Sequence, residues 1–101
     1  MISDSILRLQ QVLFSDDGLM MLLRYGHGLN HDKFKETCEI LKVIAAELSE
    51  TNEVPKILVN IFVTLYPTME SCSYMYNQAE AEKIREAAEI ILDLIGECVA
   101  I

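Results

Sequence analysis

The sequence predicts an all-α protein, a compact bundle of five or six mostly antiparallel helices with no sheet. Apolar residues recur every three or four positions along most of the chain, which is the spacing of one helix face. Residues that start and stop helices separate these periodic segments. Only one segment has strong β-propensity, and no second candidate strand exists for it to pair with. No linker divides the 101 residues, so residues 1–101 are expected to form a single helical domain.

The first helix is expected from Ser3 to about Phe14. Its apolar side consists of Ile6, Leu9 and Leu13, and polar residues occupy the opposite side. The stretch SDDG follows and ends this helix, because serine, aspartate and glycine favour turns.

A short second helix is expected over GLMMLLRY, residues 18–25. Ser15 is a candidate N-cap, and the carboxylates of Asp16 and Asp17 complement the positive end of the helix dipole. Nearly every side chain in this segment is apolar, so little of it is expected to face water.

The stretch RYGHGLNHDKF, residues 24–34, contains both histidines of the chain and two of its four glycines. Gly26 and Gly28 can take the positive φ that ends a helix. Asn30 can cap the next helix, which is expected to run from His31 to Ser49. The stretch is therefore interpreted as a turn between two helices.

The segment PKILVNIFVTLY, residues 55–66, is open to two interpretations. Its β-branched and aromatic residues favour a buried strand. However, Lys56, Asn60 and Thr64 recur every four residues and therefore form one narrow polar line on a helix. A central buried helix that begins at Pro55 is expected.

Pro67 interrupts this pattern and is expected either to kink the helix or to start a short extra helix over TMESCSYMY, residues 68–76. Asn77 and Glu80 have the spacing of a capping box, which predicts the start of the last helix. The apolar side of that helix is formed by Ile84, Ala87, Ala88, Ile91, Leu94, Ile95 and Cys98. Its opposite side, expected to face water, carries Glu82, Glu86, Glu89, Asp93 and Glu97.

The acidic composition argues against several classes of function. The net charge is −8, with 16 acidic and 8 basic residues, which is unfavourable for binding nucleic acid or an anionic membrane surface. No segment has the roughly 18 unbroken apolar residues of a membrane helix, and the opening MISDSILRLQ lacks the pattern of a signal peptide. Cys38, Cys72 and Cys98 form no CxxC pair and are expected to be reduced thiols. A cytoplasmic location is therefore expected.

Two sets of residues are candidates for metal binding or catalysis. His27 and His31 are four positions apart, as two metal ligands on one helix face are, and Asp32 adds a carboxylate. The glycines and the asparagine around them oppose a continuous helix, so a capping or solvated role is expected. Cys72 is expected to be the most exposed thiol, but no histidine lies near it in the sequence. No catalytic residue, metal or cofactor is predicted, and a small metal- or thiol-dependent enzyme is the alternative.

The predicted function is a non-enzymatic protein-binding module. Apolar residues make up 51% of the chain, and a domain of this size buries only roughly two-thirds of its surface, so apolar area is left for a partner. The acidic charge suits a basic protein, such as a toxin or effector that an immunity protein or antitoxin neutralises. Self-association as a dimer and a role as a structural subunit of a larger complex are the other interpretations.

The expected partner-binding residues are of two kinds. Methionine and tyrosine offer large, adaptable contact area, and carboxylates attract a basic partner. These residues are Met20, Met21, Met69, Tyr74, Met75, Tyr76, Glu82, Glu86, Glu89 and Asp93. Packing within the bundle is the competing interpretation of the first six, and a solvated helix face is that of the last four.

Overall fold

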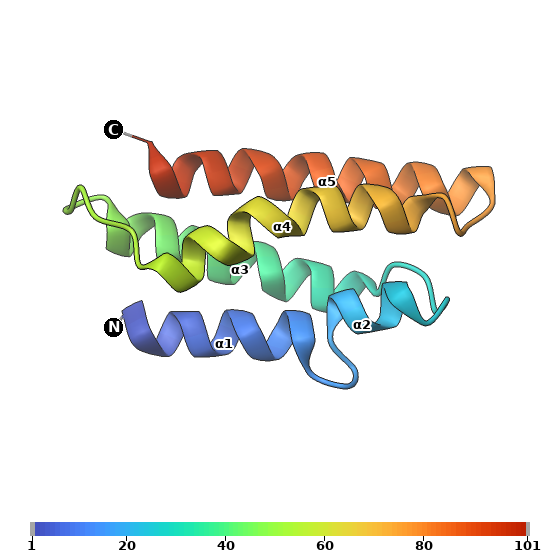
Figure 1. The fold of residues 1–101 in the computed structure, drawn as a ribbon, viewed down its shortest axis with the longest axis horizontal. Helices are drawn as coiled ribbons and strands as arrows, with labels where there is room; N and C mark the ends of the chain where they lie inside the picture. Colours follow the sequence, from blue (N-terminus) through green and yellow to red (C-terminus); the bar gives the residue numbers. More distant parts are fainter. Residues whose placement is uncertain (1, 101) are drawn as a thin grey trace.

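The computed structural model describes residues 2–100, and its regular structure is helical (Figure 1). The four long helices are α1 (Ile2–Phe14), α3 (His31–Leu48), α4 (Lys56–Ser73) and α5 (Gln78–Val99), and α2 (Leu19–Arg24) is short. The all-α class is confirmed, with no strand among residues 2–100. The radius of gyration, 13.3 Å, is that of a compact chain of about 100 residues. The expected number of five or six helices is slightly off: four helices are long, and α2 adds only a short fifth helix of 6 residues.

The long helices surround one core in the order α1, α3, α5, α4. The closest pairs are α3–α5, α4–α5 and α1–α3, and α2 lies between α1 and α4. In Figure 1, α1 and α4 run in one direction and α3 and α5 in the other, so the closely packed pair α3–α5 is parallel. The expected antiparallel arrangement holds for α1–α3 and α4–α5, whereas the consecutive helices α3 and α4 are not among the closely packed pairs. Residues 49–55 between them span about 23 Å when extended, enough to carry the chain across the bundle.

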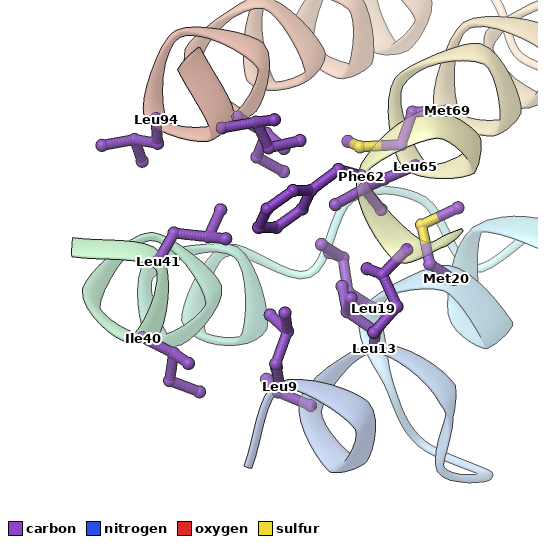
Figure 2. Close-up of a cluster of buried hydrophobic side chains, with 14 of the residues drawn as sticks. Leu9, Leu13, Leu19, Met20, Ile40, Leu41, Phe62, Leu65, Met69 and Leu94 are labelled. Atoms are coloured by element: carbon purple, nitrogen blue, oxygen red, sulfur yellow. The ribbon is translucent and has the colours of Figure 1, made fainter. Parts of the chain in front are cut away.

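The core receives side chains from all five helices. Figure 2 shows Phe62 of α4 in the middle of a cluster that includes Leu9 and Leu13 of α1, Leu19 and Met20 of α2, Ile40 and Leu41 of α3, and Leu94 of α5. Within residues 2–100, every buried side-chain nitrogen or oxygen has a hydrogen-bond partner. The core is thus apolar and its few polar groups are satisfied, as stable interiors require.

Helix α4 continues through Pro67, so of the two alternatives expected there, a kink or an extra helix over residues 68–76, the extra helix is wrong. Proline removes one backbone hydrogen bond from a helix interior. Here the buried residues Leu65 and Met69 lie one helical turn apart on either side of Pro67. A break at the proline would take one of them out of the core, so tertiary burial keeps the helix continuous.

Residues 56–66 are helical, with Pro55 as the residue that precedes α4, but this is not the central buried helix that was predicted. Ile57, Val59 and Val63 are 43%, 44% and 63% exposed. The reason is topological: α4 packs closely on α5 and α2, and its remaining side faces outward. A helix that is apolar nearly all round is therefore left with an uncovered apolar side.

Three of the predicted helix ends are confirmed. Asn30 Oδ1 accepts a hydrogen bond from Lys33 N at 2.9 Å, and Asn77 Oδ1 accepts one from Glu80 N at 2.9 Å. The two glycines of the turn after α2, Gly26 and Gly28, have φ values of +83° and +81°. These positions therefore do what their local sequence predicts.

The predicted role of Ser15 is wrong. Its hydroxyl donates to the carbonyl oxygen of Gln11 at 2.6 Å, so it satisfies the end of α1 and does not begin α2. The residue that precedes α2 is Gly18. A Cβ atom at Gly18 would lie 2.7 Å from the backbone of Leu13, so this position requires glycine for the close approach of α1 and α2.

Candidate protein-binding surface

The most apolar depression described in the protein is a groove of about 460 Å³ between α4 and α5, where exposed side chains stand beside the core residues Phe62 and Ile95. It is lined by Val59, Phe62, Val63, Tyr66, Pro67, Leu92, Ile95 and Val99. We call this feature the α4–α5 groove. The two helices run antiparallel side by side in Figure 1, so their outward rows of side chains form the two walls.

The spacing of residues on each helix explains how the groove forms. On α4, Val59 and Val63 are one turn apart, so they project from the same side of the helix. On α5, Leu92 and Val99 are seven positions, or about two turns, apart and are both more than 40% exposed. Between them, Gly96 presents no side chain, and a Cβ there would meet nothing within 4 Å. The apolar row of α4 and the apolar row of α5 therefore both face solvent, and the space next to Gly96 is open.

One edge of the groove is acidic. The hydroxyl of Tyr66 donates to Glu89 Oε1 at 3.0 Å, which fixes this carboxylate beside the groove. Its hydrogen bonds with Glu89 and Glu70 raise the pKa of Tyr66 to about 12. Asp93 is one turn beyond Glu89 on α5 and is also exposed. Negative charge thus runs along α5 beside the apolar wall.

The predicted acidic residues are all exposed on α5: Glu82, Glu86, Glu89 and Asp93. The methionines and tyrosines are divided between surface and interior. Tyr74 and Met75 are exposed, and the guanidinium of Arg85 lies over the ring of Tyr74 at 5.2 Å. Met21 is partly buried. Met20 and Met69 belong to the core and are therefore not available to a partner (Figure 2).

Tyr76 has a structural role that the sequence did not reveal. Its hydroxyl donates to the carbonyl oxygen of Leu23 at 2.6 Å and accepts from Gly28 N at 3.0 Å. Beside it, Glu80 Oε2 accepts from Leu29 N at 2.9 Å. The beginning of α5 and the turn before it are thus bonded to the turn between α2 and α3. Both residues hold the fold together at this end of the bundle.

The histidine turn is a surface feature. His27, His31 and Asp32 are exposed, and His31 borders an open depression of about 340 Å³ beside Glu80 and Lys83. Among residues 2–100, no three histidine, cysteine, aspartate or glutamate side chains are grouped so as to hold a metal ion.

One expectation about the thiols is wrong, whereas Cys98 is buried on the apolar side of α5, as predicted. Cys72, expected to be the most exposed, is buried in the core at 7% exposure, because α4 continues through it. Burial raises the pKa of Cys98 to about 11, and the Cys98 thiol donates to the carbonyl oxygen of Leu41 at 3.4 Å. Cys38 is half-buried, and desolvation raises its pKa, although Lys42 opposes part of this rise.

Sequence reasoning missed the apolar walls of the groove. Val59 and Val63 were assigned to a buried helix, and Leu92 and Val99 lie outside the predicted apolar stripe of α5. The sequence did contain one indication of an exposed apolar side. Helix α4 has apolar residues on more sides than its two neighbouring helices can cover. Which side of α4 remains exposed to solvent depends on which helices pack against it, and the sequence alone does not specify that.

None of the helices over residues 2–100 has the length and apolar content needed to cross a membrane. Compared with protein-family models, curated proteins and solved structures, the chain matches none of them.

Proposed function

We propose that this protein is a non-enzymatic protein-binding module whose partner covers the α4–α5 groove. The observation that carries the proposal is the groove itself, where Val63 is 63% exposed within a continuous apolar lining. Exposed apolar surface of this kind is unfavourable in water and typically marks an interaction site. Tyr66 adds an aromatic side chain, a residue type enriched in interfaces.

The charge of the module indicates the kind of partner. The net charge is −8, Glu89 is hydrogen-bonded to the groove residue Tyr66, and Asp93 is exposed one turn further along α5. The resulting negative electrostatic potential raises the rate at which a basic protein encounters the module, and it disfavours acidic partners. Neutralising or masking a basic protein, such as a toxin or an effector, is the function that fits these features. The exposed pair Tyr74 and Met75 lies outside the groove lining and can widen the contact.

Affinity capture with matched surface variants tests the proposal. Tagged wild-type protein, Val63→Gln and Val43→Gln are each incubated with native lysate of the source organism. Val43 is the control, because it is also exposed, at 44%, but lies on α3 away from the groove. We expect a partner that the wild type and Val43→Gln retain and that Val63→Gln loses. Equal recovery by all three proteins, or recovery of nothing, would contradict the proposal.

Light scattering during size-exclusion chromatography separates this function from self-association. A monomer is expected, since two copies with a charge of −8 each repel one another. A dimer that Val63→Gln dissociates would assign the groove to a second copy of the chain instead.

A further inference from the structure

We infer that the segment occupying the α4–α5 groove is an amphipathic α-helix of another protein with lysine or arginine along one flank. This inference rests on the proposed function and specifies the chemistry of the partner segment. It depends on three properties of the groove: its shape, the gap at Gly96 and the placement of charge along its edge.

The shape of the groove fits a helix. Its walls are the outward rows of two antiparallel helices, with residues three or four positions apart on each. Val59 to Pro67 extends along α4 for about 12 Å, which matches about two turns of a bound helix. Apolar side chains spaced i, i+3, i+4 and i+7 on that helix would interdigitate with both rows. An extended strand would leave its backbone groups unpaired here, because neither wall offers a sheet edge.

Gly96 lets such a helix come close to α5. It lies on α5 between the lining residues Leu92 and Val99, one turn after Leu92, and a Cβ there would meet nothing within 4 Å. Glycine is a poorer helix former than alanine, so it is an unfavourable choice for α5 alone. In the complex, however, the missing side chain leaves room for a side chain or the backbone of the partner helix.

The charges around the groove select the partner. Glu89 and Asp93 follow the α5 wall one turn apart, and Glu70 lies near Tyr66 on α4. Two basic residues lie near this region. Lys56 begins α4, and Arg85, whose guanidinium lies over the ring of Tyr74, borders a small depression together with Tyr66, Glu70 and Glu89, so the two carboxylates outnumber the one cation there. A second copy of the chain would bring the same acidic edge to the groove, and like charges in contact are unfavourable. A cationic flank on the bound helix instead meets the carboxylates of Glu89 and Asp93.

Designed peptides test the inference directly. The probe is a fluorescent helical peptide of about 14 residues, or four turns, with leucines on one face and lysines on the flank. One control peptide carries glutamates in place of the lysines, and another carries glutamines in place of the leucines. Binding is measured by fluorescence anisotropy, and the contact surface by backbone amide chemical shifts. We expect the lysine peptide alone to bind, with shifts centred on Val59, Val63, Leu92 and Gly96.

Charge reversal provides the decisive comparison. In Glu89→Lys/Asp93→Lys, we expect the lysine peptide to bind at least tenfold more weakly and the glutamate peptide to gain affinity. Glu36→Lys/Glu39→Lys on α3 is the matched control, because both residues are exposed and lie outside the groove lining, and it should leave the order of affinities unchanged. Gly96→Gln should weaken binding of the lysine peptide without changing the far-ultraviolet circular dichroism.

The outcomes separate this inference from the proposed function. Equal binding of the lysine and glutamate peptides, shifts away from the groove, or no binding at millimolar peptide overturns the inference. A captured partner that depends on Val63 but contacts the groove through an acidic or non-helical segment also overturns it, while the proposed function survives. Binding of the lysine peptide with the expected reversal supports the inference, even if the lysate yields no partner and the proposed function fails.

Discussion

The hydroxyl of Tyr76 donates to the carbonyl oxygen of Leu23 at 2.6 Å across 53 positions of the chain. The same oxygen atom accepts from Gly28 N, so one side chain satisfies two backbone groups at the end of α2 and in the turn that follows. This contact ties the α4–α5 connection to the α2–α3 connection.

Removal of this hydroxyl should destabilise the protein. In Tyr76→Phe, the Gly28 amide loses its partner and the Leu23 carbonyl keeps only the bond from Gly26 N at 3.3 Å, and an unpaired polar group that is shielded from water costs about 1–3 kcal/mol. We expect the free energy of unfolding in urea to fall by about that amount. Tyr74→Phe is the control, since Tyr74 is 73% exposed, and it should change stability by less than about 0.5 kcal/mol. Equal stability of the two variants would refute this role.

The two glycines of the histidine turn should differ in their tolerance to alanine. Both have positive φ, so either substitution is expected to cost about 1–2 kcal/mol. At Gly28, a Cβ would also lie 3.1 Å from Glu80 Oε2, whereas nothing lies within 4 Å at Gly26. Glu80 is held in place by its hydrogen bond from Leu29 N, so Gly28→Ala should be the more destabilising variant in thermal unfolding. A larger loss for Gly26→Ala would contradict this reasoning.

Replacement of Pro67 should stabilise the protein. Proline inside a helix costs about 3 kcal/mol relative to alanine, because it removes a hydrogen bond and crowds the preceding turn. In Pro67→Ala, α4 gains an amide donor in its interior, and we expect the melting temperature to rise. Pro55→Ala, at the residue before α4, should instead leave it equal or slightly lower, since proline there restricts the unfolded chain. A lower melting temperature for Pro67→Ala than for Pro55→Ala would show that the packing of α4 depends on the proline at position 67.

The pKa of Tyr66 gives a pH-dependent prediction. The hydrogen bonds of Tyr66 to Glu89 and Glu70 raise its pKa to about 12, whereas a tyrosine in the unfolded chain has a pKa of about 10. The folded state therefore keeps its proton to higher pH, and this contribution to stability is present below pH 10 and lost between about pH 10 and 12. In an absorbance titration of tyrosinate, Glu89→Gln should lower the pKa of Tyr66, identified by comparison with Tyr66→Phe. Glu82→Gln should leave it unchanged.

The three thiols should react in a fixed order. Cys38 is half-buried, whereas Cys72 and Cys98 are in the core. At neutral pH, a thiol reagent should modify Cys38 slowly, since burial raises its pKa, and should reach the other two only after unfolding. The Cys38→Ser variant should therefore show almost no reaction while folded. Rapid modification of that variant would mean that Cys72 or Cys98 is accessible in the native state.

Local features of the fold could be predicted from the sequence. The caps at Asn30 and Asn77 act within three residues, and the apolar stripe of α5 repeats often enough to define its buried side. The environment of α4 could not be predicted, because it depends on α3 packing against α5 and not against α4. For the same reason, the outward position of Val63 and the contact of Tyr76 with Leu23 are visible only in the folded chain.

The parallel packing of α3 on α5 also affects how the chain folds during synthesis. The apolar side of α3 finds one of its closest neighbours only after residues 78–99 have been made. A nascent chain that ends after α4 has α1, α2 and α3 in place but exposes part of α3 to solvent. Stable tertiary structure should therefore wait for the last helix to leave the ribosome, and chains stalled before that point should be sensitive to proteases and depend on chaperones.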